Sequence, residues 1–243
     1  MSTPMISVRN LQKWYSGVHA LKGVNLDFQS GEVCGLVGDN GAGKSTLIKI
    51  LAGVHRPDSG EIRIAGQLVE IRSPKAAMKL GLETIYQDNS MVPTMSIARN
   101  LFIGREPLWF GFAGLGLIDH RRMRDDAMRA IANVDLHLRS ADALLSELSG
   151  GQRQGVAIAR AMHFKSRVMI LDEPTNHLSV KEIKKVLGFV RSLSAQGVTG
   201  ILISHNLHHV FESCDRIVAM ARGEIVLDKP VRETNVEEVS EVL

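Results

Sequence analysis

The sequence feature that most restricts how this chain can fold is the glycine-rich segment GDNGAGKST at residues 38–46. It follows directly on the apolar run VCGLV at residues 33–37 and leads into TLIKILAG, a run typical of a helix. A strand that turns through glycines into a helix points successive backbone N–H groups at phosphate oxygens, and the helix start adds partial positive charge. The segment therefore predicts an α/β fold with a phosphate-binding loop.

The loop also carries the side chains that such a site needs. Lys44 is placed to reach the terminal phosphates of a nucleotide, and the hydroxyl of Ser45 is a ligand that suits Mg²⁺. A glycine-rich turn with a solvated lysine is the structural alternative, which the strand and helix on either side disfavour. The predicted nucleotide-binding residues of this segment are Gly38, Asp39, Asn40, Gly41, Ala42, Gly43, Lys44, Ser45 and Thr46.

Three apolar runs predict a mostly parallel sheet. Residues 33–37, 168–171 and 201–203 are continuously apolar rather than alternating, which is typical of strands covered on both faces. Polar residues follow each run directly. Because ligands bind beyond the carboxyl ends of such strands, these polar residues are expected to meet at one site.

The remaining segments predict two additions to this sheet within a single domain, residues 1–243. Residues 7–28 and 60–71 alternate between strand and turn patterns, which favours a second, antiparallel sheet. Residues 89–165 contain two helix-like stretches, 121–134 and 152–164, and no strong strand run, which favours a helical subdomain. The nucleotide-binding core would then comprise residues 1–88 and 166–243.

Two acidic residues close the run VMIL. Asp172 is placed to hold Mg²⁺, directly or through water, and Glu173 to polarise an attacking water molecule. Acidic residues are also common in the first turn of a helix, so the pair alone is weak. Beside a phosphate-binding loop, the magnesium and general-base interpretation is favoured.

The segment LSGGQRQGVAIARA at residues 148–161 predicts a second helix start that can bind an anion. The hydroxyl of Ser149 can donate to a phosphate, and Gly150 and Gly151 allow the backbone to approach closely. A capped helix without a ligand is the alternative for LSGG taken alone.

Composition excludes several classes of protein. The 243 residues are 44% hydrophobic and 23% charged with a net charge of +3, which excludes a disordered chain and gives no support to nucleic acid binding. Cys34 and Cys214 form no metal-binding or disulfide pattern and favour a reducing compartment. No secretory signal is expected. The apolar run at residues 107–118 is too short for a membrane span, so it is a contact surface or a partly buried loop.

Together these motifs resemble the nucleotide-binding domain of ABC transporters over essentially the whole chain. GDNGAGKST, Gln87, LSGGQ, VMILDEP and His205 occur in that family's order and at about its separations. The resemblance implies a RecA-like P-loop fold that binds ATP and Mg²⁺. It also implies that Tyr15 stacks on adenine, that Gln87 senses Mg²⁺ and nucleotide, and that His205 contacts the γ-phosphate. Taken singly, these three residues fit a surface aromatic, a loop amide and a helix cap.

The resemblance further implies a head-to-tail homodimer. In that family Ser149, Gly150, Gly151 and Gln152 of one chain would cover the ATP bound by the loop of the other. One departure concerns residues 176–179, which are NHLS where the family usually shows SALD, so that Ser179 stands where aspartate is common.

Other details are similar to the ATPases of bacterial importers for ribose, xylose and fructose. They are Asp39, Gly155, SIARNLFIGREP and ISHNLHHVFE. This similarity implies an ATP-hydrolysing subunit, peripheral on the cytoplasmic face of the inner membrane. Its partners would be transmembrane permease subunits and, indirectly, a periplasmic solute-binding protein. The alternatives are an exporter ATPase and a non-transport ATPase acting on ribosomes or DNA.

Overall fold

The structure, a computed structural model, describes residues 3–86, 91–112, 115–134 and 136–243. The chain divides into two compact units. The first unit comprises Met1–Tyr86, Ser166–Asn176 and Ile183–Leu243, and the second unit comprises Gln87–Lys165 and His177–Glu182.

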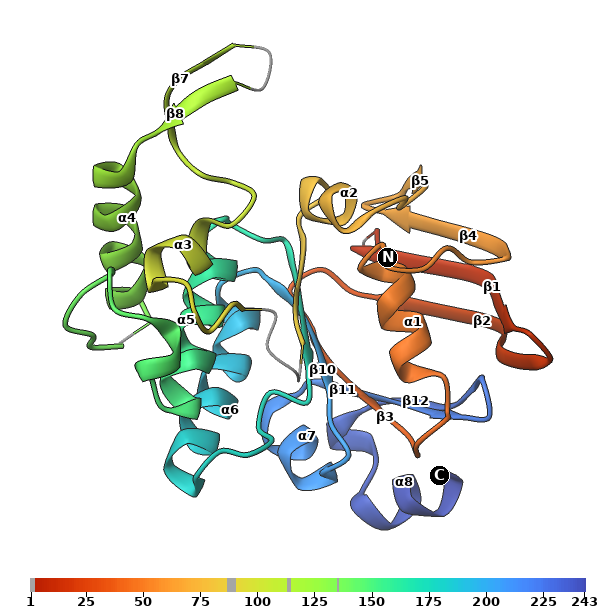
Figure 1. Cartoon of the computed structure of the whole chain (residues 1–243). Helices are drawn as coiled ribbons and strands as arrows, with labels where there is room; N and C mark the ends of the chain where they lie inside the picture. Colours follow the sequence, from red (N-terminus) through yellow and green to blue (C-terminus); the bar gives the residue numbers. More distant parts are fainter. Residues whose placement is uncertain (1–2, 87–90, 113–114, 135) are drawn as a thin grey trace. The chain divides into compact units, whose positions relative to one another are not determined.

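The centre of the first unit is a six-stranded sheet with the strand order β12-β11-β3-β10-β9-β6 (Figure 1). Neighbouring strands are parallel except for β12, which is antiparallel to β11. Every residue of β3 and β10 is buried, because both faces of the sheet are covered. The predicted mostly parallel sheet is therefore confirmed. The strands are β3 (Val33–Val37), β6 (Leu82–Ile85), β9 (Val168–Asp172), β10 (Thr199–Ile203), β11 (Arg216–Ala221) and β12 (Glu224–Pro230).

A second sheet in this unit is antiparallel, as the alternating pattern predicts. Its order is β2-β1-β4-β5, with β1 (Ile6–Tyr15), β2 (Val18–Phe28), β4 (Ser59–Ile64) and β5 (Gln67–Val69). Helix α1 (Lys44–Leu51) contributes Leu47, Ile48, Ile50 and Leu51 to a core shared with strands of both sheets. Burial of these side chains fixes the helix that follows the glycine-rich loop.

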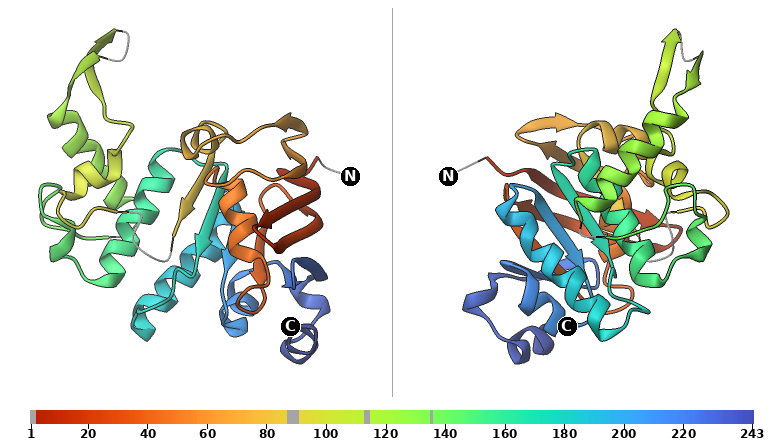
Figure 2. Two further views of the ribbon diagram at one scale, coloured as in Figure 1. Left: turned by 45° about the vertical axis from the view of Figure 1, so that its right-hand side comes forward. Right: turned by 90° about the vertical axis from the view of Figure 1, so that its left-hand side faces the viewer.

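The other helices of the first unit are short, apart from α6. They are α2 (Pro74–Lys79), α6 (Val180–Ala195), whose first turn belongs to the second unit, α7 (Leu207–Ser213) and α8 (Val236–Val242), with a 3-10 turn at Val231–Glu233. Helix α8 contacts β11 and β12 near the C-terminus (Figure 2). Among the described residues, no helix is both long and apolar enough to cross a membrane.

The second unit contains three helices that pack on one another, as expected for the inserted helical subdomain. These are α3 (Ile97–Phe102), α4 (His120–Ala132) and α5 (Gly150–His163), with a 3-10 turn at Leu145–Glu147. The expectation of no strand here is wrong. Strands β7 (Leu108–Phe112) and β8 (Leu115–Ile118) form an antiparallel hairpin. The aromatic residues favour strand, and the uniformly apolar sequence hides the period-2 signal because neither face is polar.

Candidate functional site

The glycine-rich loop connects β3 to α1. At two of its glycines, the backbone of neighbouring strands leaves no room for a Cβ atom. Gly38 has φ 149° and Gly43 has φ 106°, values that residues with a Cβ rarely adopt. A Cβ on Gly38 would lie 2.3 Å from the carbonyl oxygen of Met220, and one on Gly43 would lie 2.8 Å from that of Ala20. Strands β2 and β11 therefore impose the glycines from outside the loop.

Helix α1 begins without a side-chain cap from any described residue. Its first-turn N–H groups and its dipole are therefore directed at the loop, where an anion is favoured. The loop closes on itself through the Ala42 N–H, which donates to the carbonyl of Asp39 over 3.1 Å. This arrangement suits phosphate oxygens.

The ammonium of Lys44 lies over the same loop. Its Nζ donates to the carbonyl of Gly38 over 2.5 Å and to that of Asp39 over 3.0 Å. Burial lowers the pKa of Lys44, while the carboxylates of Glu173, Asp39 and Asp172 oppose that shift. The lysine and these carboxylates are thus within electrostatic reach of one another, as the convergence of the strand ends predicts.

A cavity of about 530 Å³ opens beside the loop. Its lining includes three cationic side chains, Lys22, Lys44 and Arg222, and no carboxylate among the described lining residues, so it favours an anionic ligand. The sequence predicted the loop portion of this lining but missed the residues from β2 and Arg222. The lining residues are Val18, His19, Ala20, Lys22, Asn40, Gly41, Ala42, Gly43, Lys44, Ser45, Thr46 and Arg222.

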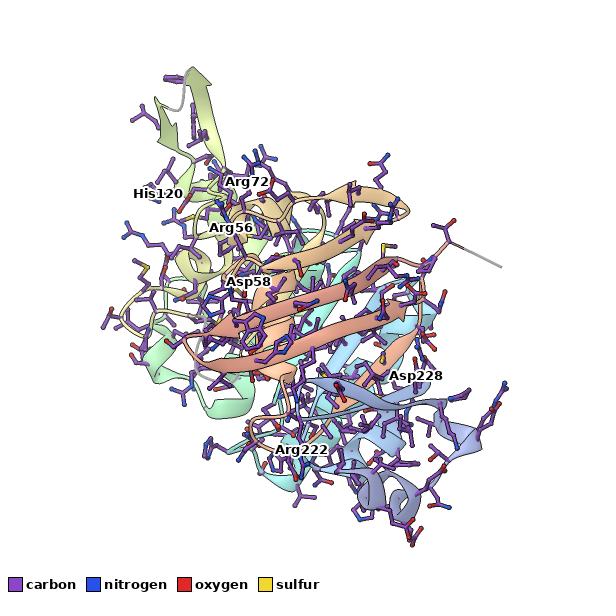
Figure 3. The ribbon with its side chains drawn as sticks, turned by 90° about the vertical axis from the view of Figure 1, so that its right-hand side faces the viewer. Arg56, Asp58, Arg72, His120, Arg222 and Asp228 are labelled. Carbon is purple, nitrogen blue, oxygen red and sulfur yellow. The ribbon has the colours of Figure 1, made fainter. Side chains whose placement is uncertain are left out.

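Arg222 lies in the turn between β11 and β12, which connects the loop to β2 (Figure 3). The Gly223 N–H donates to the carbonyl of Ala42, and the Lys22 N–H donates to the carbonyl of Gly223, each over 2.9 Å. The dipeptide Arg-Gly between two strand-like runs is a recognisable turn signal. Nothing in the sequence, however, shows that this turn meets the loop.

An aromatic pair lies at the β1–β2 turn beside the cavity. The ring of Trp14 stacks on that of His19, with centroids 3.7 Å apart and planes 9° apart. The Trp14 N–H donates to the carboxylate of Asp58 over 2.6 Å, which holds the end of β1. Tyr15 is exposed, lies edge-on to His55 at 5.6 Å, and is not part of the cavity lining. His19 rather than Tyr15 is therefore the aromatic ring in the lining.

Glu173 is held rigidly just beyond β9. Its backbone has φ 50°, its N–H donates to the carbonyl of Ile203 over 3.0 Å, and its Oε1 accepts the His205 N–H over 3.0 Å. The buried Oε2 lies 2.9 Å from Nδ1 of His205 and forms an ion pair with that ring when it is protonated. Each carboxylate oxygen has more than one lone pair, so this contact leaves Oε2 able to accept a proton.

The loops after β9 and β10 are joined by His209, which the sequence analysis missed. Its Nδ1 lies 3.2 Å from the hydroxyl of the buried Thr175, and its Nε2 lies 3.3 Å from Nδ2 of Asn206. Burial lowers the pKa of His209, which favours the neutral ring. These contacts support the loops that carry Glu173 and His205.

The start of α5 is capped from within the second unit. The hydroxyl of Ser149 accepts the Gln152 N–H over 3.2 Å, and the Gln152 side chain accepts the Ser149 N–H over 2.9 Å, which is a capping box. Oε1 of Glu182 accepts the Gly151 N–H over 3.1 Å and the Ser149 hydroxyl over 3.3 Å. A carboxylate therefore already lies at this helix start.

Ser179, which stands where relatives often have aspartate, caps the start of α6. Its N–H and hydroxyl donate to Oε2 of Glu182 over 2.9 and 2.8 Å, and its hydroxyl accepts the Glu182 N–H over 3.4 Å. These hydrogen bonds lower the pKa of Glu182. Serine is a good N-cap, so the substitution preserves the helix start.

The predicted magnesium ligands are only partly described. Ser45 lines the cavity and Asp172 ends β9, while Gln87 lies outside the described residues. The described residues contain no group of three or more His, Cys, Asp or Glu side chains able to hold a metal ion. Hydroxyl and carboxylate oxygens are nevertheless the donors that Mg²⁺ prefers.

Comparisons with known proteins agree with this geometry. A family model described as ABC transporter matches residues 21–176. The xylose/arabinose import ATP-binding protein XylG of Sulfolobus acidocaldarius is 40% identical over 98% of this chain and 93% of its own length. The fructose import ATP-binding protein FrcA of Rhizobium meliloti is 43% identical over 88% of this chain and 84% of its own length. A ribose import ATP-binding protein of Rubrobacter xylanophilus is 40% identical, and the match spans 95% of this chain but 45% of that protein.

Solved structures show the same fold. A dimeric ATP-binding cassette in a post-hydrolysis state, bound to ADP and Pi, superposes with a TM-score of 0.79 at 27% identity, covering 94% of this chain and 99% of that one. A component of an ABC transporter complex of Clostridium perfringens has a TM-score of 0.80 at 28% identity, covering 98% of this chain and 93% of that one. The α/β fold with its antiparallel sheet and helical insertion is confirmed.

Proposed function

The chain belongs to the ABC transporter family of ATP-binding proteins, and from this premise we propose that it hydrolyses ATP to drive import of a sugar through separate membrane subunits. Relatives named for xylose/arabinose, fructose and ribose import support the sugar class. The observation that carries the hydrolysis is the position of Glu173, whose Oε1 accepts the His205 N–H over 3.0 Å, whose Oε2 lies 2.9 Å from Nδ1 of His205, and whose charge acts on Lys44.

The loop and its cations bind the triphosphate. Backbone N–H groups at the start of α1 donate to phosphate oxygens. When the nucleotide binds, the ammonium of Lys44 leaves the carbonyls of Gly38 and Asp39 and donates to the β and γ phosphates. Lys22 and Arg222 add further positive charge to the cavity lining. Tyr15, or the Trp14 and His19 pair, supplies the aromatic surface for adenine.

Glu173 acts as the general base in hydrolysis. Oε2 accepts a proton from water as the water oxygen bonds to the γ-phosphorus and the bond from that phosphorus to the leaving ADP oxygen breaks. The left-handed backbone of Glu173 and the His205 N–H hold the carboxylate in position before the reaction. His205 is placed to contact the γ-phosphate.

Mg²⁺ is the proposed cofactor, and the donors available suit it. The hydroxyl of Ser45 and the carboxylate of Asp172 would hold the ion, with Gln87 as a further ligand. When bound, the ion neutralises charge on the phosphate oxygens.

Two chains would pair so that each completes the other's site. Ser149, Gly150, Gly151 and Gln152 of one chain would bind the γ-phosphate held by the loop of its partner, which supplies the second helix dipole. The proposed core comprises residues 1–88 and 166–243, and the helical subdomain residues 89–165. The partners would be permease subunits, with a periplasmic solute-binding protein acting through them, at the inner face of the membrane.

Purification with partners, followed by transport, tests this proposal. The tagged chain is crosslinked in its own cells and its partners are identified by mass spectrometry. We expect a permease and a solute-binding protein. Proteoliposomes containing that complex should hydrolyse ATP faster with one of xylose, arabinose, fructose or ribose. Recovery of ribosomes or DNA instead, or hydrolysis unaffected by any sugar, would contradict sugar import.

A further inference from the structure

The β7–β8 hairpin is the most apolar exposed segment of the second unit. Residues 108–118 read LWFGFAGLGLI and contain no charged side chain and no hydrogen-bonding side chain apart from the indole N–H of Trp109. The register pairs Leu108 with Ile118 and Phe112 with Leu115, so the hairpin satisfies its inner backbone groups itself.

Neither face of this hairpin is covered by the described residues. Successive strand residues point to opposite faces, yet Trp109 and Phe110 are 70% and 67% exposed. On the other strand, Leu117 is 67% exposed. The alternative of a partly buried loop packed on its own subdomain is therefore wrong, and the exposed side chains need a partner outside the unit.

Basic side chains surround the foot of the hairpin, where β8 leads into α4. His120, Arg121, Arg122 and Arg124 are exposed in the first turns of α4, where the helix dipole disfavours positive charge. His120 is labelled at this foot in Figure 3. A local electrostatic cost of this kind is a mark of function rather than of folding.

Three carboxylates near these basic residues are engaged, whereas that of Asp125 in α4 is exposed. Asp119 caps α4 by accepting the Arg122 N–H over 2.9 Å, and Glu106 accepts the Gly104 N–H over 3.1 Å. Asp126 pairs with Arg122 and Arg129. Arg124 forms an ion pair with Asp142 over 3.9 Å. Arg121 has no ion-pair partner within the described part of the chain, so its guanidinium is available to an external anion.

We propose that the hairpin inserts into the headgroup region of an anionic lipid bilayer, with the apolar side chains at the acyl boundary and Arg121 of α4 on a lipid phosphate. A typical interface with a protein partner contains hydrogen bonds from side chains, and the side chains of this segment can form almost none. Lipid requires none, and Trp and Phe beside basic residues are typical of membrane-surface anchors. The inference rests on the proposed function only in bringing the chain to a membrane.

The hairpin can insert only to a shallow depth, because each of its two strands has one edge without a neighbouring strand in the described part of the chain. The outer edges of β7 and β8 pair with no strand among the described residues, so their backbone groups need water or headgroups. The hairpin therefore reaches the interface without crossing the bilayer.

Trp109 supplies a direct test because the chain has only two tryptophans. In the Trp14→Phe variant, Trp109 is the sole tryptophan. On adding vesicles of phosphatidylcholine and phosphatidylglycerol, we expect its emission to shift to the blue and to be quenched by brominated acyl chains. The Trp109→Phe variant, which keeps Trp14, should show neither change.

Cosedimentation with the same vesicles measures the affinity. Replacing Trp109 and Phe110 by serine should lower vesicle binding by about tenfold or more, while Leu68→Ser, at an exposed apolar residue of β5, should not change it. Arg121→Glu should weaken binding to phosphatidylglycerol vesicles more than to phosphatidylcholine alone. Circular dichroism of each variant reports whether the chain is folded.

Three results would overturn the proposal. The first is Trp109 emission that does not change when vesicles are added. The second is that the serine substitutions dissociate a dimer of the chain but leave vesicle binding unchanged. The third is quenching of Trp109 that occurs only when the permease is present. Lys44→Ala should keep vesicle binding. Failure of ATP hydrolysis would thus contradict the proposed function alone, and failure of vesicle binding would contradict the hairpin proposal alone.

Discussion

Helices α1 and α5 both begin after glycines, but their first turns are organised differently. No described side chain caps α1, and its loop is shaped by Gly38 and Gly43 at positive φ against the backbone of neighbouring strands. The start of α5 carries a capping box from Ser149 and Gln152, and the carboxylate of Glu182 accepts the Gly151 N–H. Similar sequence patterns thus produce one helix start whose N–H groups no described side chain caps and one whose N–H groups already donate to side chains.

Under the proposed function, this difference gives the two helix starts different roles in binding phosphate. The α1 start has unmet donors and a lysine, so it should bind phosphate in the isolated chain. At the α5 start an external phosphate must compete with Glu182, so binding there should require a phosphate that another chain presents. The following experiments test that comparison, in order of decreasing effect.

Lys44→Ala should abolish productive MgATP binding and hydrolysis, because it removes the cation facing the β and γ phosphates. Nucleotide titration of the isolated chain measures the loss. Lys49→Ala, a basic residue of the same helix at its last turn, serves as the matched control. Unchanged affinity together with unchanged turnover would refute the assignment of the α1 start.

Ser149→Arg should leave ATP binding by the monomer nearly intact but eliminate ATP-driven pairing and hydrolysis, because the side chain serves the partner's site. Loss of the N-cap costs about 1 kcal/mol of helix stability, so Ser149→Thr is the control that keeps a cap. Size-exclusion chromatography follows pairing.

Mixing two variants separates the two helix starts further. Ser149→Arg chains mixed with Lys44→Ala chains should regain at most one of two composite sites. A Ser149→Arg monomer that no longer binds ATP would contradict the division of duties.

Glu173→Gln should keep ATP and Mg²⁺ binding but slow hydrolysis by about 100-fold or more, the scale for losing a general base. The amide also removes negative charge near the γ-phosphate, so the variant should persist as an ATP-bound dimer on size exclusion. Asp172→Asn should instead weaken the dependence on Mg²⁺. Wild-type turnover by Glu173→Gln in the assembled transporter would show that Glu173 is not the base.

Glu182→Gln should give the smallest effect, a shift of ATP-driven pairing to ATP concentrations a few-fold lower, because the competing charge at the α5 start is gone. Light scattering during ATP titration measures it. Lys181→Gln, the neighbouring charge, is the control. An unchanged or higher ATP requirement would show that Glu182 does not compete.

The pH dependence of stability also tests the charged state of the Glu182 carboxylate. Hydrogen bonds from Ser179 lower the pKa of Glu182, so its contribution is present above its unfolded pKa and is lost as pH falls through the lower folded value. The difference in unfolding free energy between wild type and Glu182→Gln should therefore shrink in acid. A difference that stays constant across this range would contradict the charged cap.

The sequence predicted the parts of the site that are encoded locally. The loop follows from glycines between a strand and a helix, and the parallel sheet follows from continuous apolar runs. Arg222 and His19 escaped prediction because they reach the cavity from other strands, and no local pattern records that packing. Glu182 escaped for a similar reason, since only folding brings it to Gly151.

The hairpin was missed for a different physical reason. Strands are recognised by alternation or by burial. The sequence of residues 108–118 is uniformly apolar and does not alternate, and Trp109, Phe110 and Leu117 are exposed. Ser179, in contrast, has a role that the local sequence does predict. Its departure from the family pattern is explained by a capping box with Glu182, which the spacing S-x-x-E already contains.

The strand order of the central sheet determines when the phosphate loop can form during synthesis. Strand β3 pairs only with β10 and β11, and the Val33 N–H donates to the Asp215 carboxylate across 182 residues of chain. A ribosome releases the loop after β2 but long before β11, whose Met220 carbonyl closes over Gly38. The nascent chain therefore lacks a formed nucleotide site until its last strands pair, and ATP can assist only the final step of folding.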